Sequence, residues 1–135
     1  MFNLFKYKTK NNLLNDSNNT SFKILDFEKL SNIKNEKMKK ILSYVSDTPI
    51  FFAENKRLLS KDEIENFEQQ YECKINIYIP LIDIYDNDFI VFDSQNEIFG
   101  LFNIVDETFF KKIDIDKIIE ELKKFLNEWK NVWFI

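Results

Sequence analysis

The acidic residues of IPLIDIYDNDFIVFD, residues 79–93, are the first candidates for chemistry in this 135-residue chain. Carboxylates close together can bind Mg²⁺ or Ca²⁺, can work as an acid–base pair, or can form a negatively charged binding surface. The candidate residues are Asp83, Tyr85, Asp86, Asp88 and Asp93. Which chemistry they support depends on their spacing and on the residues available around them.

A calcium-binding loop of the EF-hand type does not fit this spacing. Such a loop needs a glycine at its sixth position and a glutamate at its twelfth. In the registers that start at Asp86 and Asp93, the sixth residues are Val91 and Ile98. A non-consecutive Mg²⁺ or Ca²⁺ site and a catalytic carboxylate pair stay open as alternatives. The residues for either would be Asp83, Asp86 and Asp88.

The composition removes most of the common catalytic classes. The chain has no histidine, so Ser–His and Cys–His relays and most zinc sites are excluded. Its one glycine, Gly100, cannot build a glycine-rich phosphate loop. Its one cysteine, Cys73, has no histidine to activate it and is interpreted as a small apolar residue between a helix and a strand. We therefore expect a protein without catalytic residues, metal or cofactor.

Charge is distributed unevenly along the chain. Residues 75–110 carry seven acidic residues and no Lys or Arg, whereas the rest carries 19 basic and 16 acidic residues. Such a segment favours a negative surface that attracts a basic protein partner, with the five candidate residues as its binding site. The preference of turns for Asp and Asn is the alternative explanation. A pI of about 5.0 argues against nucleic-acid binding.

Two helices are predicted in the first half of the chain. Apolar residues at helical spacing predict an amphipathic helix over 28–44. A second helix is predicted over 61–71, because Ser60 and Glu63 have the spacing of a capping box. A third helix follows Asp114 or Asp116, either of which can cap it. Its expected buried face is formed by Ile118, Ile119, Leu122, Phe125, Leu126 and Trp129.

Short strands are predicted by alternating or continuously apolar runs. The last two form a hairpin through the turn residues 94–97, and Gly100 within the second indicates a bulge or a close approach of another segment. The predicted strands are 22–27, 50–53, 75–80, 89–92 and 98–104. With the helices, they predict one α+β domain over residues 1–135, in which an antiparallel sheet of about 4–6 strands packs against helices. No internal repeat is expected.

The two ends of the chain have their own compositions. Residues 1–8 are aromatic and are expected to form an edge strand or strap, and the Asn-rich residues 9–21 a polar loop. The apolar tail, residues 132–135, is expected to pack on the core or on a second subunit, which leaves homo-oligomer formation open. Without a signal peptide or a membrane-crossing apolar run, the expected location is the cytoplasm.

Three motifs together resemble the SUKH superfamily of bacterial immunity proteins and fungal cell-wall-assembly regulators. LLSKDEIENFEQQY is similar to the helix-opening motif of that superfamily, and YIPLIDIYDNDFIVFD to its strand–turn–strand beginning with Ile-Pro. LFNIVDETFF before an amphipathic helix is similar to its usual ending. The resemblance covers about residues 58–126 and implies an α+β fold that acts by binding rather than by catalysis.

The resemblance implies a protein that neutralises a cognate bacterial toxin, such as a nuclease or deaminase. A nuclease is basic where it holds phosphates, so an acidic inhibitor can occupy that surface. Two alternatives stay open at this point. One is a scaffold or regulator of the fungal type, and the other is a carboxylate- or metal-dependent enzyme.

Overall fold

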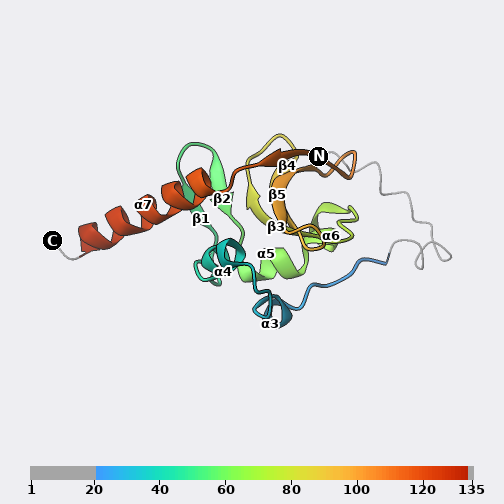
Figure 1. The fold of residues 1–135 in the computed structure, drawn as a ribbon, viewed down its shortest axis with the longest axis horizontal. Coiled ribbons are helices and arrows are strands. Elements are labelled where there is room, and N and C mark those ends of the chain that lie inside the picture. Colours follow the sequence, from blue (N-terminus) through green and yellow to red (C-terminus); the bar gives the residue numbers. More distant parts are fainter. Residues whose placement is uncertain (1–20, 134–135) are drawn as a thin grey trace.

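The computed structural model describes residues 21–133, with side chains through Glu128 (Figure 1). Its helices are α3 (Phe27–Leu30), α4 (Glu36–Leu42), α5 (Lys61–Glu65), α6 (Phe67–Tyr71) and α7 (Asp116–Trp133). Its strands are β1 (Ile50–Phe52), β2 (Lys56–Leu58), β3 (Tyr78–Asp83), β4 (Asp88–Asp93), β5 (Ile98–Asn103) and β6 (Thr108–Ile113). The predicted α+β class is confirmed. The predictions for residues 1–20 and for packing of the tail lie outside the described part.

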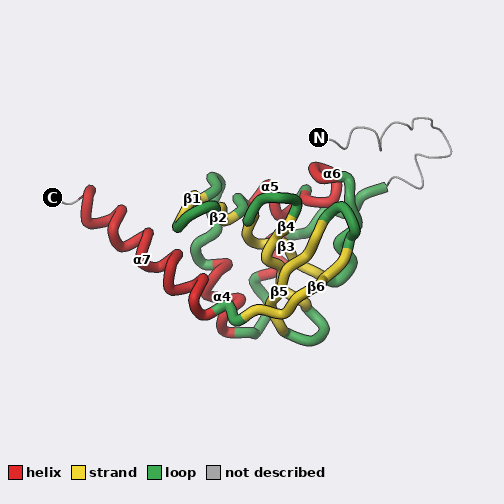
Figure 2. Tube along the Cα trace, turned by 90° about the horizontal axis from the view of Figure 1, so that it is seen from above, coloured by secondary structure: helices red, strands yellow, loops and turns green. Residues whose placement is uncertain are grey.

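The six strands form one antiparallel sheet in which sequence neighbours are also spatial neighbours, in the order β1-β2-β3-β4-β5-β6 (Figure 2). This meander agrees with the predicted antiparallel sheet. Alternate turns of a meander lie at the same end of its sheet. The β1–β2, β3–β4 and β5–β6 turns therefore share one end, which we call the acidic end because exposed acidic residues lie in all three turns.

The two faces of the sheet are covered by different helices. Phe67 of α6 meets Phe89 of β4 edge to face, with ring centroids 4.8 Å apart, so α6 covers the face that carries Phe89. On the other face, the ion pair of Lys56 with Glu121 (3.3 Å) joins β2 to α7. Buried apolar side chains from both faces fill the core, among them Phe67, Phe89, Leu58, Ile82 and Leu122.

A ten-residue regularity runs through the hairpins, although no internal repeat was expected from the sequence. Asp83, Asp93 and Asn103 follow one another at intervals of ten residues, and each accepts a backbone N–H from two residues further along. Four residues after each of them stands a residue with positive φ, namely Asn87, Glu97 and Glu107. The same side-chain cap thus starts three turns, and two of them end in a glutamate with positive φ, where a glycine would fit more easily.

The predicted helix over 28–44 is wrong as a continuous element. The chain leaves the helical path between α3 and α4, and the Asn35 side chain accepts the N–H of Met38 at 3.0 Å to cap α4. Asparagine is favoured at the N-cap of a helix and disfavoured in the helix interior, which explains the break. The predicted strand over 22–27 is also wrong, because Asp26 caps α3 there.

The capping box of Ser60 and Glu63 is confirmed, with both reciprocal hydrogen bonds present. The predicted helix over 61–71 is interrupted at Asn66, which separates α5 from α6. Strand β2, Lys56–Leu58, was not predicted, because three residues of mixed charge and apolarity give no alternating pattern.

Strand β3 differs from its prediction, whereas β4 and β5 agree closely with theirs. β3 begins at Tyr78 and continues through Pro80 to Asp83, with an irregular register between Pro80 and Ile82. The predicted close approach at Gly100 is confirmed, because a Cβ there would lie 2.1 Å from the Phe109 ring. Glycine is therefore required where β5 meets β6.

Helix α7 begins at the end of β6 and extends away from the sheet (Figures 1 and 2). Asp114 accepts the N–H of Asp116 at 3.0 Å, so it is the predicted acidic side chain that holds the helix start. Lys37 of α4 pairs with Asp116 at 2.8 Å at the same end, on the surface. Among the described helices, none combines the length and apolarity that crossing a bilayer requires.

Candidate protein-interaction site

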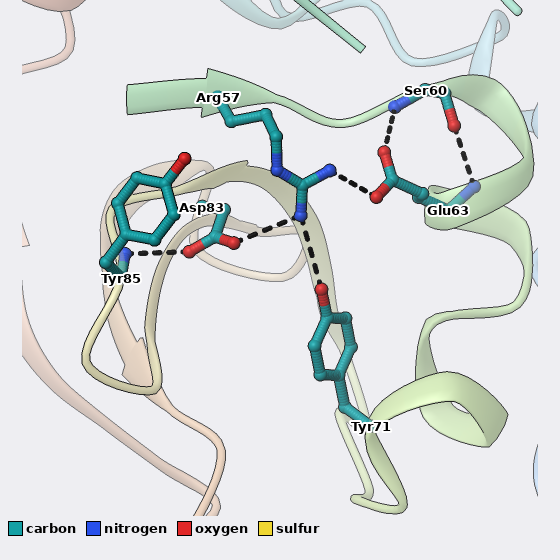
Figure 3. Close-up of polar contacts among 6 residues, drawn as sticks. All are labelled: Arg57, Ser60, Glu63, Tyr71, Asp83 and Tyr85. Atoms are coloured by element: carbon teal, nitrogen blue, oxygen red, sulfur yellow. Dashed lines mark hydrogen bonds and ion pairs between the residues drawn. The ribbon is translucent and has the colours of Figure 1, made fainter. Parts of the chain in front are cut away.

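Arg57, the chain's only arginine, lies in β2 between two other strands. The register places it opposite Phe51 of β1 and opposite Asp83 of β3. Its guanidinium pairs with the carboxylates of Glu63 and Asp83, the latter at 3.0 Å from Nη2 to Oδ2 (Figure 3). The side chains of Arg57, Glu63 and Asp83 are only 13%, 16% and 12% exposed. One largely buried cation is therefore held between two carboxylates.

Glu63 connects this ion network to the start of α5. One of its carboxylate oxygens accepts the backbone N–H of Ser60 at 2.9 Å, and the other accepts from Arg57. Burial raises the pKa of the Glu63 carboxyl, but the hydrogen bonds from Ser60 and Arg57 outweigh it, so the pKa lies below its ordinary value. Burial likewise lowers the pKa of Arg57, and its two carboxylate partners raise it overall. Both groups are charged at neutral pH.

Tyr71 of α6 extends the network into the aromatic core. Its hydroxyl accepts a hydrogen bond from Arg57 Nη2 at 3.3 Å, and its ring meets Phe67 and Phe89 with centroids 4.8 and 5.0 Å apart. Burial is the main cause that raises the pKa of the Tyr71 hydroxyl above its ordinary value, with Arg57 acting in the opposite direction. The tyrosine is therefore a neutral, anchored member of the network.

Asp83 links the buried network to the β3–β4 turn. Its Oδ2 accepts from Arg57, while its Oδ1 accepts the backbone N–H of Tyr85 at 2.7 Å (Figure 3). Tyr85, Asp86 and Asn87 then have φ values of 72°, 59° and 69°, three consecutive left-handed residues without a glycine. Each costs about 1 kcal/mol relative to a relaxed backbone, least for asparagine. The turn is thus a strained conformation held by hydrogen bonds from the strands.

Two large aromatic residues stay exposed beside this network. Phe51 is 61% exposed and Tyr85 is 40% exposed, and we call these two residues the aromatic pair. The Arg57 guanidinium lies 6.0 Å from the centre of the Phe51 ring, at the outer range of a cation–π contact. A mostly buried ion network is therefore flanked by exposed aromatic surface.

Charge at the acidic end is predominantly negative. The exposed acids of its three turns are Glu54, Asp86, Asp106 and Glu107. Ile104 N–H donates to the Asn87 carbonyl at 2.9 Å, which ties the β3–β4 and β5–β6 turns together. At the β5–β6 turn, Lys74 donates its backbone N–H to Glu107. Glu107 is therefore held by a backbone group, whereas Lys56 and Lys117 line the same surface pocket as Glu54.

The structure separates the five predicted site residues. Tyr85 and Asp86 are exposed at the acidic end, and Asp88 is half-buried there, with its carboxylate accepting from Asn103 at 2.8 Å. Asp83 belongs to the Arg57 network. That these residues contact a partner stays a prediction, and only Tyr85, Asp86 and part of Asp88 are accessible for it.

Asp93 was expected to be exposed on the binding surface, and this expectation is wrong. It is buried and lies at the opposite end of the sheet, where it accepts from Gln95 N–H at 2.9 Å and from Asn96 N–H at 3.0 Å. Burial raises the pKa of the Asp93 carboxyl, but the hydrogen bonds of Asn96 and Gln95 outweigh it and lower the pKa. Its carboxylate organises the β4–β5 turn. Asp83 is corrected in the same way, because Arg57 draws it inward.

The open alternative of a metal site gains no support from the geometry. Within the described residues, no three or more carboxylate, cysteine or histidine groups are arranged to hold a metal ion. Asp83 and Asp88 have separate partners, Arg57 and Asn103.

Sequence reasoning missed four residues of this site. They are Phe51, Arg57, Glu63 in its ion pair, and Tyr71. The one signal in the sequence was that a chain with 19 basic residues contains a single arginine. Arginine holds two carboxylates at once better than lysine, because its planar fork has five donors.

Comparison with known proteins gives no family for this chain. No protein-family model matches it, and neither the curated proteins nor the solved structures include a match. The SUKH resemblance therefore stays a prediction from the sequence motifs.

Proposed function

We propose that this chain is a non-catalytic protein-binding module of the immunity type, which neutralises a cognate bacterial toxin by covering a basic surface of it. The observation that carries the proposal is the β3–β4 turn. It presents Tyr85 and Asp86 in a strained conformation that Asp83 and Arg57 hold in place. The SUKH-like motifs supply the class of partner.

A held turn is suited to binding because little flexibility is lost when a partner docks. Ordering a loop at an interface costs free energy, so a turn already fixed in its bound conformation binds more tightly. Tyrosine is enriched at the energetic centres of interfaces, since it offers a large rigid area with few rotatable bonds. The strain at Tyr85, Asp86 and Asn87 is the kind of backbone cost that functional sites retain.

The charge of the acidic end selects for a basic partner. Glu54 and Asp86 are exposed on adjacent turns, and the Arg57 network adds one net negative charge from two carboxylates and one guanidinium. Negative surfaces accelerate encounter with positive ones and suppress encounter with acidic proteins. A toxin that acts on nucleic acid carries the basic surface that fits.

Co-expression with the nuclease and deaminase toxin domains of the source genome, one at a time, tests the proposal. We expect cells to survive with the wild-type chain and a stable complex to be recovered from them. Asp86→Lys should weaken protection, whereas Lys123→Glu, a charge reversal on the exposed face of α7, should not. Cell death despite a folded wild-type chain would refute the proposal for that toxin.

A scaffold or regulator is the second candidate, favoured by one observation. Helix α7 extends away from the sheet, and Phe125 and Leu126 remain half-buried along it. Self-association through α7 and the apolar residues that follow would suit such a role. Light scattering before and after deletion of residues 132–135 distinguishes the two candidates. The molecular mass of the particle in solution should fall to that of a monomer for a self-associating scaffold, whereas a monomeric binder should stay a monomer.

A further inference from the structure

The aromatic pair, Phe51 and Tyr85, stands out among the exposed apolar residues because an ion network lies between its members. Phe51 is opposite Arg57, Arg57 is opposite Asp83, and Asp83 holds the backbone of Tyr85. Since neighbouring strands are about 4.8 Å apart, the strands that bear Phe51 and Asp83 are separated by about 10 Å. The two members of the aromatic pair therefore lie on opposite sides of the Arg57 network.

We propose that the aromatic pair receives an arginine side chain of the partner. Its guanidinium would stack on the Tyr85 ring and pair with the Asp86 carboxylate, while its aliphatic stem would cover Phe51. This rests on the proposed function, and it names the group that the acidic end recognises.

Charge decides against an apolar occupant. The network has two carboxylates for one guanidinium, and Asp86 and Glu54 lie on the adjacent turns. An apolar group placed here would remove the exposed Asp86 and Glu54 carboxylates from water without giving them a partner, which costs free energy. A cation compensates that cost.

Shape decides for arginine over lysine. The guanidinium is planar and weakly hydrated, so it stacks on an aromatic face while its N–H groups still reach a carboxylate. The Arg57 guanidinium, 6.0 Å from the Phe51 ring, leaves most of that ring exposed. Lysine is a compact, strongly hydrated charge that gains less from such surfaces.

Titration of the ¹⁵N-labelled chain with a glycine–arginine repeat peptide tests this proposal. We expect shifts of the amide signals of Phe51, Arg57 and residues 85–87, with weaker binding of the matched glycine–lysine peptide. Tyr85→Ala should weaken arginine-peptide binding by about fivefold, the value of a moderate cation–π contact, and Phe51→Ala should weaken it through the lost contact with the aliphatic stem. Both residues are exposed, so the variants are expected to fold.

Phe110→Ala is the matched control, because Phe110 is also an exposed phenylalanine, on β6 at the far edge of the sheet. Equal weakening by Phe110→Ala, shifts centred elsewhere, or equal affinity for the lysine peptide would each overturn the proposal. A toxin complex that forms normally with Phe51→Ala and Tyr85→Ala would refute the aromatic pair and leave the proposed function standing. Arginine-peptide binding at the aromatic pair without toxin protection would refute the proposed function and leave the arginine-binding role of the pair standing.

Discussion

Arg57 Nη2 donates to Asp83 Oδ2 at 3.0 Å, and this contact joins the chain's only arginine to the turn that carries Tyr85. The other oxygen of the same carboxylate accepts the Tyr85 N–H. Any change at Arg57 therefore acts on the exposed turn through Asp83. Stability of the sheet and presentation of the acidic end depend on one side chain.

Arg57→Met should destabilise the fold strongly. It would leave Glu63 and Asp83 largely buried without their cation, and removing one partner of such a group costs about 3 kcal/mol. The free energy of unfolding from urea denaturation measures this. Combining Arg57→Met with Glu63→Gln and Asp83→Asn should restore much of the loss, because no unpaired charge remains.

The exposed pair of Lys39 with Glu36 gives the control for Arg57. Lys39→Met should change the free energy of unfolding by about 0.5 kcal/mol or less. A similarly small effect of Arg57→Met would contradict the account, since it would mean that the network contributes no more than a surface ion pair.

Glu63 should give the fold a dependence on acid pH. Its pKa is lower in the folded chain than the value of about 4.3 expected when unfolded. The stability it contributes is therefore present above pH about 4.3 and is lost as the pH falls through the folded pKa. In urea titrations between pH about 5 and about 2, Glu63→Gln should show a shallower loss of stability than wild type. Identical slopes would show that Glu63 does not carry this dependence.

Position 72 should accommodate glycine better than the glutamate that occupies it. It ends α6 with φ 53° and ψ 51°, a left-handed conformation that glycine adopts without steric cost. Glycine loses more conformational entropy on folding than glutamate, which offsets part of this gain. Glu72→Gly should therefore raise the free energy of unfolding by about 0.5 kcal/mol. Thermal melts of both variants measure this, and Gln69→Gly, inside the same helix, should lower the free energy of unfolding by about 1 kcal/mol. Destabilisation by both variants would argue against the left-handed end.

Gly100→Ala should destabilise the β5–β6 pairing. The added Cβ would lie 2.1 Å from the Phe109 ring and 2.4 Å from the Lys111 carbonyl oxygen, and the backbone atom cannot rotate away. We expect a loss of about 1–3 kcal/mol in urea denaturation, the range for overpacking. Gln95→Ala in the exposed β4–β5 turn should stay within about 0.5 kcal/mol of wild type. A neutral Gly100→Ala would mean that the two strands are further apart than described.

Local rules allowed correct prediction of several elements. The Ser60–Glu63 capping box depends on residues three apart, and the apolar run of β4 is long enough to identify a central strand. The break at Asn35 and the short strand β2 were missed, because a single cap and a three-residue pairing depend on neighbours elsewhere in the chain. The sheet class was predictable, whereas the exact helix boundaries were not.

The candidate site was only partly predictable for the same reason. Asp83 looks like a turn aspartate in the sequence, and its burial depends on Arg57, which precedes it by 26 residues. Nothing in the spacing of either residue indicates that β2 will bring them together. Tyr85 and Asp86 were predicted as accessible site residues because they occupy a polar turn, and the structure does expose them.

The association rate of the chain with a toxin domain that it neutralises tests the central claim most directly. It should be measured by stopped flow at several salt concentrations for wild type, Asp86→Lys and the control Lys123→Glu. If the acidic end docks on a basic surface, Asp86→Lys should slow association by about tenfold and flatten its salt dependence, while the control leaves both unchanged. An Asp86→Lys variant that associates at the wild-type rate and salt dependence would contradict the claim.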